Sequence, residues 1–381
     1  MKKKVAGALI FVFVLLYPLV VSNVYYQRIG VISCIFAILA TSLGLLVGQV
    51  RLVSAGHAAF FGIGAYTSAL LTTKASLPFL VGFAAAIVMS AAIGFLFAIP
   101  VLRLKGHYLS MATLAFGIVV QMVMLNWESV TNGPNGIPGI PYVSFFSVQL
   151  DTDVKMYYFT LMLLLLILWG LSRIYRSPFG RTLNMIREDE IAAATLGVHV
   201  VRFKVTAFTI SAGLAGLAGS LFAHYMSYIN YDTFSPMESF MILAMVVVGG
   251  MHTLFGPVLG AVLLSSIPEL LREFSDYRML IYGVVLVIIL LFRRRGDRGP
   301  HRGQRGREND HHEQHFRPGS GQERENFVQG TGYYRHGTLQ RAAARNQPCA
   351  GGPARLCRPD GGGKFVYRGL SSRQGGPVQR F

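Results

Sequence analysis

The sequence predicts an all-α, polytopic membrane protein with about eight transmembrane helices and one additional glycine-rich, re-entrant or broken-helix element. The first observation is composition: of 381 residues, 52% are hydrophobic and only 14% are charged, whereas soluble domains carry about 25% charged residues. The second is that apolar runs near the roughly 20 residues needed to cross a bilayer recur along most of the chain. The third is that basic residues gather on alternate connections between these runs.

The candidate spans follow one another with polar connections between them. They are Val5–Val21, Ile29–Val47, Ser54–Thr73, Leu77–Leu102, Tyr108–Asn126, Met156–Leu171, Val205–Tyr228 and Tyr277–Phe292. The first span follows three lysines, as the apolar region of a signal peptide would. Because no convincing small-residue cleavage site follows it, we expect an uncleaved first helix.

A further apolar region, Glu238–Ile267, is interrupted by Gly249-Gly250 and Gly256-Pro257, which should break a helix. A single crossing here would place Arg293–Arg295 on the outer side, against the positive-inside rule. A pair of half-helices that enters the membrane and returns restores the parity. Irregular backbone at that depth is tolerated where protein buries it, and we therefore expect a re-entrant element.

Basic residues give the orientation of the spans. Lys2–Lys4 place the N-terminus in the cytoplasm, and alternating spans then place Arg51, Arg103 and the region from Arg173 to Lys204 on the same side. The connections on the opposite side hold few basic residues. The pattern predicts a multi-pass inner-membrane protein with a cytoplasmic N-terminus.

A short polar segment, Arg187–Gly197, lies between two spans on the predicted cytoplasmic side. Its three acids would stabilise a helix N-terminus, and Gly197 suits a left-handed C-cap. Three consecutive alanines, at positions 192–194, would form a flat face that another protein could approach. The alternative is a solvated connecting helix. The acids Glu128, Glu238 and Glu269 lie near span ends, so the spans lack the acid chain of a proton-driven transporter, which favours an external energy source.

Four stretches carry a resemblance to a known family: Ser54–Tyr66, Leu102–Leu114, Ser177–Gly197 and Val246–Gly260. In these stretches the chain resembles the LivM-type inner-membrane permease subunits of branched-chain amino acid ABC importers. The resemblance implies that the chain is not an enzyme, and that its partners are ABC ATPase subunits, a second permease subunit, a periplasmic amino-acid binding protein and membrane lipid. ATP hydrolysis would occur in a partner chain. No cofactor, metal or nucleic acid is implied.

The same resemblance implies two sets of site residues. The segment that couples to the ATPase comprises Arg187, Glu188, Asp189, Glu190, Ala192, Ala193, Leu196 and Gly197. The translocation path is expected to include Gly56, His57, Gly62, Gly64, Tyr66 and Thr113. The small residues of Ser54–Thr73 are also explained by helix packing, although three glycines in nine positions suggest a broken or bent helix. A histidine in a span is a functional candidate by default, unless it lies at the membrane boundary.

The ligand is the least determined part of this interpretation. Within the same superfamily the chain could carry urea, amides or a sugar, because the path residues do not specify a ligand. An alternative from another class is an ion-coupled secondary transporter. The two classes differ in their need for an ATPase partner.

Residues 293–381 form a tail that differs from the permease domain, residues 1–292. The tail contains 17 arginines but one lysine, and it is rich in glycine. Such a segment buries too little apolar area to fold, and we expect it to be disordered. It could bind RNA or anionic lipid, and its histidines at 311, 312 and 315 could bind a metal. We favour a third interpretation, that a frameshift near Phe292–Asp297 created the tail.

Overall fold

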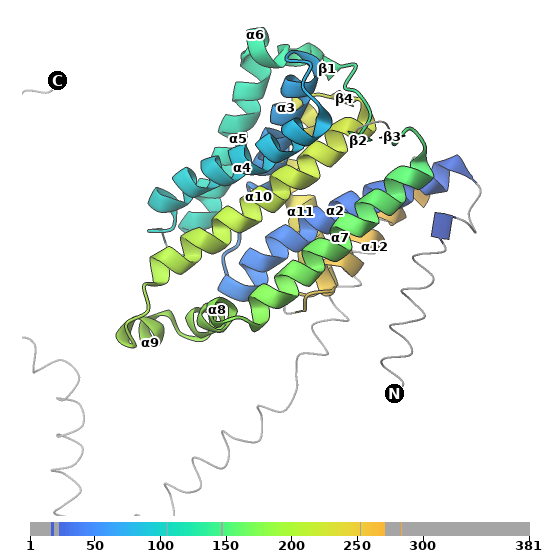
Figure 1. Cartoon of the computed structure of the whole chain (residues 1–381). Coiled ribbons are helices and arrows are strands. Elements are labelled where there is room, and N and C mark those ends of the chain that lie inside the picture. The colour runs from blue at the N-terminus through green and yellow to red at the C-terminus, as the bar shows by residue number, and fades with distance from the viewer. Residues whose placement is uncertain are drawn as a thin grey trace, which may run out of the picture. The chain divides into compact units, whose positions relative to one another are not determined.

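The computed structural model describes residues 17–18, 23–104, 106–145, 148–251, 253–270 and 283, and this part of the chain is almost entirely helical (Figure 1). Apart from three of their residues, the expected spans Val5–Val21 and Tyr277–Phe292 lie outside the described residues. The tail lies outside them as well. Its division from the permease domain, its disorder and its origin therefore stay predictions.

Five described helices are long and apolar enough to cross a membrane, which confirms the predicted polytopic all-α class. They are α2 (Val24–Val50), α4 (Phe79–Val101), α5 (His107–Asn126), α7 (Asp153–Arg176) and α10 (Val200–Met226). A further apolar helix, α3 (His57–Thr73), is slightly shorter. It is continuous through Gly62 and Gly64, whereas residues 51–56, which include Gly56, are irregular. The expected interruption of Ser54–Thr73 is therefore found at its start and not within α3.

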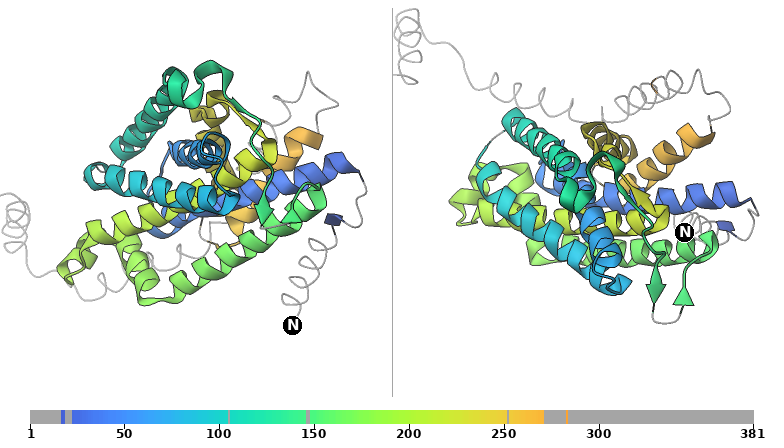
Figure 2. Two further views of the ribbon diagram at one scale, coloured as in Figure 1. Left: turned by 45° about the horizontal axis from the view of Figure 1, so that its top comes forward. Right: turned by 90° about the horizontal axis from the view of Figure 1, so that it is seen from above.

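Helices α2, α3 and α10 form the centre of the bundle (Figure 2). Of the most apolar window of each helix, 83% is buried in α2 and 78% in α10, but only 28% in α4 and 22% in α5. The apolar side chains that α4 and α5 expose, such as Val88, Leu96 and Met111, suit contact with lipid tails. The central helices instead bury small and polar residues against one another.

Glycines allow these central helices to approach at backbone distance. A Cβ on Gly64 of α3 would collide with the backbone of Gly216 of α10, and one on Gly219 would lie 2.8 Å from the amide nitrogen of Ala65. Gly216 in turn packs against Ser90 of α4. The prediction that small-residue stripes mark tight helix contacts is confirmed here.

The predicted broken element is present as two short helices, α11 (Pro236–Gly249) and α12 (Gly256–Leu270). Residues 250–255 separate them, at the glycine-rich stretch that the sequence singled out. A Cβ on Gly260 would collide with the carbonyl of Met245, and one on Gly249 would lie 2.8 Å from the nitrogen of Gly260. Because residues on both sides of the break are in backbone contact, the two helices pack against each other as a hairpin.

The connection between α5 and α7 is ordered by short elements. In sequence order these are α6 (Glu128–Thr131), η1 (Gly133–Asn135), β1 (Ile137–Pro138), β2 (Ser144–Phe145) and β3 (Val148–Gln149). Both strand pairs are antiparallel: β2 pairs with β3, and β1 pairs with β4 (Tyr228–Ile229), which precedes η2 (Tyr231–Phe234). The connection is also held to the end of α3, because the amine of Lys74 donates to the carbonyls of Ser129 and Val130 in α6, at 2.9 and 2.8 Å.

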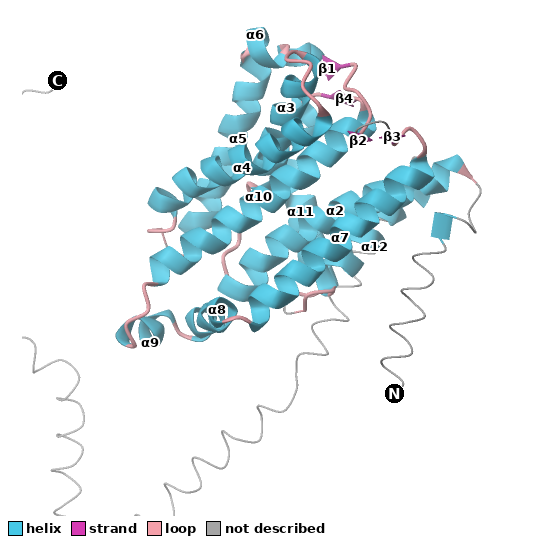
Figure 3. Cartoon of the chain, viewed as in Figure 1, coloured by secondary structure: helices cyan, strands magenta, loops and turns pink. Residues whose placement is uncertain are grey.

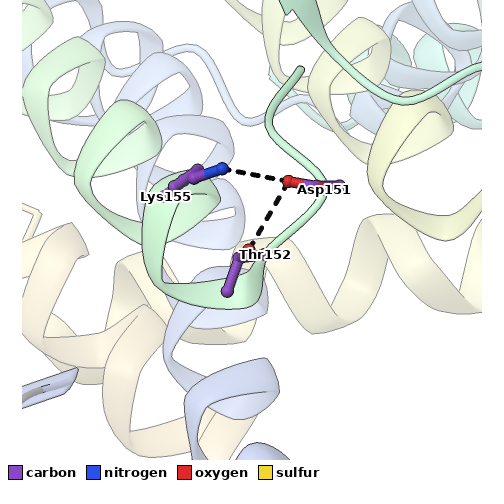
Figure 4. A network of polar contacts seen from close by, with 3 residues as sticks. All are labelled: Asp151, Thr152 and Lys155. Atoms are coloured by element: carbon purple, nitrogen blue, oxygen red, sulfur yellow. Dashed lines mark hydrogen bonds and ion pairs between the residues drawn. The ribbon is translucent and has the colours of Figure 1, made fainter. Parts of the chain in front are cut away.

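The start of α7 is marked by a surface ion pair (Figure 4). Lys155 Nζ lies 3.1 Å from Asp151 Oδ1, which also accepts a hydrogen bond from the Thr152 hydroxyl at 3.5 Å. The hydrogen bond from Lys155 lowers the pKa of Asp151 below its ordinary value. Both side chains are exposed, so the pair contributes little to the stability of the fold.

Candidate functional site

The polar segment between α7 and α10 folds as two short helices at one end of the bundle (Figure 3). The first, α8 (Pro178–Glu188), begins with a proline at its first position and Ser177 as its N-cap. Gly180 lies against the carbonyls of Ile174 and Tyr175, which allows the chain to turn sharply out of α7. Leu183 and Ile186 of α8 are buried, so this helix packs on the bundle with its apolar face.

The second helix, α9 (Glu190–Thr195), has well-formed caps at both ends. Asp189 Oδ1 accepts hydrogen bonds from the amides of Ile191 and Ala192, at 2.9 and 3.0 Å. At the other end Gly197 has a φ of +82° and donates to the carbonyl of Ala194, which confirms the predicted C-cap. The single helix expected to open with all three acids is wrong, because Asp189 adopts an extended, capping conformation that ends α8 and starts α9.

The two faces of α9 differ from the expected flat alanine surface. Ala193 is buried, with 2% of its surface exposed, and it packs with Ile186 and Val200. Ile191 and Leu196, by contrast, expose 77% and 72% of their surfaces. The expectation that Ala193 faces a partner is therefore wrong, since it anchors α9 to the bundle. Sequence reasoning did not single out Ile191, although its position two residues before Ala193 places it on another helix face.

Two charged side chains of the segment also face the bundle. Glu190 Oε2 lies 2.7 Å from Lys204 Nζ, and this ion pair connects α9 to α10. Arg187 Nη1 donates a 3.0 Å hydrogen bond to the carbonyl of Gly48 in α2. The accessible residues of the predicted coupling set are Glu188, Asp189, Glu190, Ala192, Leu196 and Gly197.

The predicted path residues are all buried, and the structure brings some of them together. Gly56 precedes α3, and a Cβ at this position would collide with the carbonyl of Thr113 in α5. Thr113 Oγ1 also accepts a 3.0 Å hydrogen bond from the amide of Ala55. These contacts join the start of α3 to α5, so Gly56 and Thr113 have a structural role whatever else they do.

His57 and Tyr66 are the polar members of the path set. His57 is completely buried within the protein and its Nε2 lies 2.7 Å from Ser42 Oγ. It is the first residue of α3, and the alternative that it lies at the membrane boundary stays open. Among the described residues, His57 Nδ1 and the Tyr66 hydroxyl have no hydrogen-bond partner. Buried polar groups usually have partners, so both atoms could accept or donate a further bond.

The two remaining path residues lie in different surroundings. Gly62 packs on Phe234 of η2, whose ring is also 5.8 Å from that of Tyr66. Gly64 lies instead in the crossing of α3 with α10. The structure therefore groups Gly62 with Tyr66, whereas Gly64 is a packing residue of the helix crossing.

The helices that could cross a membrane and the broken pair are the architecture of a multi-pass membrane protein. Residues 25–290 match the family described as the permease component of branched-chain amino acid transport systems, and the chain belongs to this family. The resemblance noted in the sequence is thereby confirmed.

Individual relatives agree with this assignment. The chain is 38% identical to the high-affinity branched-chain amino acid transport system permease protein LivM of Salmonella typhimurium, over 77% of this chain and 75% of the relative. Identity to LivM of Escherichia coli is 37%, with the same coverage. An autoinducer 2 import system permease protein, LsrC of Salmonella paratyphi B, is 34% identical over 35% of this chain and 40% of the relative.

Proposed function

We propose that this chain is a permease subunit of an ATP-driven importer of branched-chain amino acids. It forms the translocation path with a second permease, receives its ligand from a periplasmic binding protein and is driven by ATPase subunits. Family membership and the LivM relatives, which cover most of the chain, support this function. The chain itself supplies helices that rearrange, and hydrolysis takes place in its partners.

The ATPase docks on α9. The observation that carries this assignment is a pair of exposed apolar side chains, Ile191 in α9 and Leu196 at its C-cap, on a helix that is otherwise firmly anchored. Exposed apolar residues on an ordered surface favour a protein partner. The Asp189 cap, the Glu190–Lys204 ion pair and the buried Ala193 hold α9 to α8 and α10. A displacement of α9 by the ATPase would therefore move α8 and α10 as well.

This end of the molecule faces the cytoplasm in our proposal. Basic residues gather here: Arg51 follows α2, Arg173 and Arg176 lie in the last turn of α7, and Arg202 lies in the first turn of α10. The positive-inside rule favours the cytoplasmic side for such an end. The N-terminus is then cytoplasmic as well, by the alternation of spans.

Substitution of the exposed pair tests the docking assignment. We expect Ile191→Arg with Leu196→Arg to reduce recovery of the ATPase with the purified permease by on the order of ten-fold or more, since both apolar contacts are lost. Ala193→Arg is a poorer test because Ala193 is buried. Tyr142→Arg, at an exposed position in the connection between α5 and α7, is the control and should retain the ATPase. Normal recovery from the double variant, at equal membrane levels, would contradict the assignment.

Uptake assays test the energy source and the ligand. Proteoliposomes with the complete transporter should accumulate leucine only with internal ATP, and a hydrolysis-dead ATPase should abolish uptake. Uptake that persists without the ATPase would instead support an ion-coupled carrier. Competition by isoleucine and valine, but not by urea or sugars, is expected. The partial match to an autoinducer 2 permease makes the non-amino-acid competitors a necessary part of this assay.

A further inference from the structure

Arg187 makes a contact that docking to an ATPase does not explain. Its side chain turns away from the exposed surface of α9, has 19% of its area exposed, and donates from Nη1 to the carbonyl of Gly48, 139 residues earlier in the chain. Nη2 lies 3.2 Å from Glu188 Oε1. The guanidinium thus connects the end of α8 to the end of α2.

The end of α2 has a chemical need for such a cation. The last four carbonyls of a helix lack partners within it, and together they carry a partial negative charge. Gly48 is the third residue from the end of α2, and α2, described over its whole length, has no basic residue in its last turn. Arg187 supplies from another helix a donor to one of these carbonyls, and a positive charge beside that of Arg51, the C-cap of α2.

Gly48 also lies against the break between α11 and α12. A Cβ on Gly48 would collide with the carbonyl of Met251, and one on Gly44 would lie 2.7 Å from Cγ of Pro257. These two glycines, one helical turn apart, form a smooth edge of α2 against the start of α12. Gly48 is therefore in contact both with Arg187 and with the broken element.

We propose that Arg187 is a positioning residue that transmits movement of the coupling segment, through the end of α2, to the break between α11 and α12. This inference rests on the proposed function, because it requires α9 to be the element that the ATPase moves. Arg187 is two residues before Asp189, where the chain passes from α8 to α9. The contact of Gly48 with Met251 is made by backbone atoms, so no flexible side chain is available to absorb a displacement.

The geometry explains why an arginine serves here. Its planar group carries several donors, so one side chain binds Gly48 and Glu188 at the same time. Nε is buried and has no hydrogen-bond partner among the described residues.

The test is the number of ATP molecules hydrolysed per leucine transported, measured on the complete transporter in proteoliposomes. In Arg187→Gln we expect this ratio to rise on the order of ten-fold, because a hydrogen bond to a charged group is lost from the transmission path. Recovery of the ATPase with the permease should be unchanged, since Ile191 and Leu196 are intact. Arg187→Lys keeps the charge but cannot bind both acceptors, and we expect an intermediate ratio. Arg181→Gln, at an exposed position of the same helix, is the matched control.

Each result decides between specific alternatives. A wild-type ratio in Arg187→Gln would overturn the inference, and so would loss of the ATPase, which would make Arg187 a docking contact. If Arg187→Gln does not assemble, Arg187→Lys decides, and a wild-type ratio in that variant would overturn the inference. Wild-type transporter that transports leucine without ATP would refute the proposed function itself, whatever the variants do.

Discussion

At the scale of single residues, the clearest polar contact in the core belongs to His224 of α10. Its Nδ1 lies 2.7 Å from the carbonyl of Pro141 and its Nε2 lies 2.8 Å from Ser68 Oγ, which also accepts a hydrogen bond from Ser220. Because a carbonyl only accepts, Nδ1 carries the hydrogen and Nε2 accepts from Ser68. One imidazole thus joins α3, α10 and the connection between α5 and α7.

Removal of this imidazole should destabilise the permease. His224→Ala leaves the Ser68 hydroxyl and the Pro141 carbonyl without this partner and opens a cavity, at a combined cost of about 2–4 kcal/mol in the free energy of unfolding. We expect a lower thermal midpoint for the detergent-purified protein. His199→Ala, at an exposed position, is the control. Equal midpoints for the two variants would show that the network contributes nothing.

Sequence reasoning found His57 but not His224, although both are buried histidines of apolar helices. The partners explain the difference, because His224 pairs with residues 83 and 156 positions away, which no local pattern reveals. Arg187 is a similar case. The sequence placed it correctly in the polar segment, but its acceptor is a backbone carbonyl of a distant helix, and a carbonyl has no sequence signature.

At the scale of elements, the spans and the broken pair were predictable because length, hydropathy and glycine-proline breaks determine them locally. The helix boundary within Arg187–Gly197 was not predictable, because an aspartate such as Asp189 can either continue a helix or cap its start. Ile186, Ala193 and Val200, from α8, α9 and α10, pack together in the folded chain, and no local pattern reveals this contact. The face that α9 exposes follows from that packing.

Substitution of glycines by alanine distinguishes glycines that a close helix crossing requires from glycines that face open space. Gly64→Ala places a Cβ against the backbone of Gly216, so α3 and α10 must move apart, and we expect at least several-fold less folded permease in membranes. Gly170 of α7 is the matched control, since among the described residues no atom beyond its chain neighbours and the nearby backbone of α7 lies within 4 Å of its Cβ position. There the same substitution should be neutral or stabilising by about 0.5–1 kcal/mol. Folded yield can be compared by size-exclusion chromatography of tagged variants, and equal yields would contradict the close contact.

At the scale of the whole molecule, the described bundle has two different ends. Helices α8 and α9 lie at one end, and α6 with the paired strands β1 and β4 lies at the other (Figure 1). Arginines concentrate at the first end, whereas the second is built from turns and short strands. The asymmetry suits a transporter that is driven from one side and receives its ligand from the other.

This polarity predicts which positions react from each side of the membrane. In a background that retains the buried Cys34 and replaces Cys349 and Cys357 by serine, we expect Thr195→Cys to react with a membrane-impermeant maleimide only in inside-out vesicles. Asn135→Cys, exposed at the opposite end, should react only in spheroplasts. The reason is the positive-inside rule, which places the arginine-rich end in the cytoplasm. Labelling of both cysteines from the same side would contradict a bundle that spans the membrane, and exchanged sides would contradict both the orientation and ATPase docking on α9.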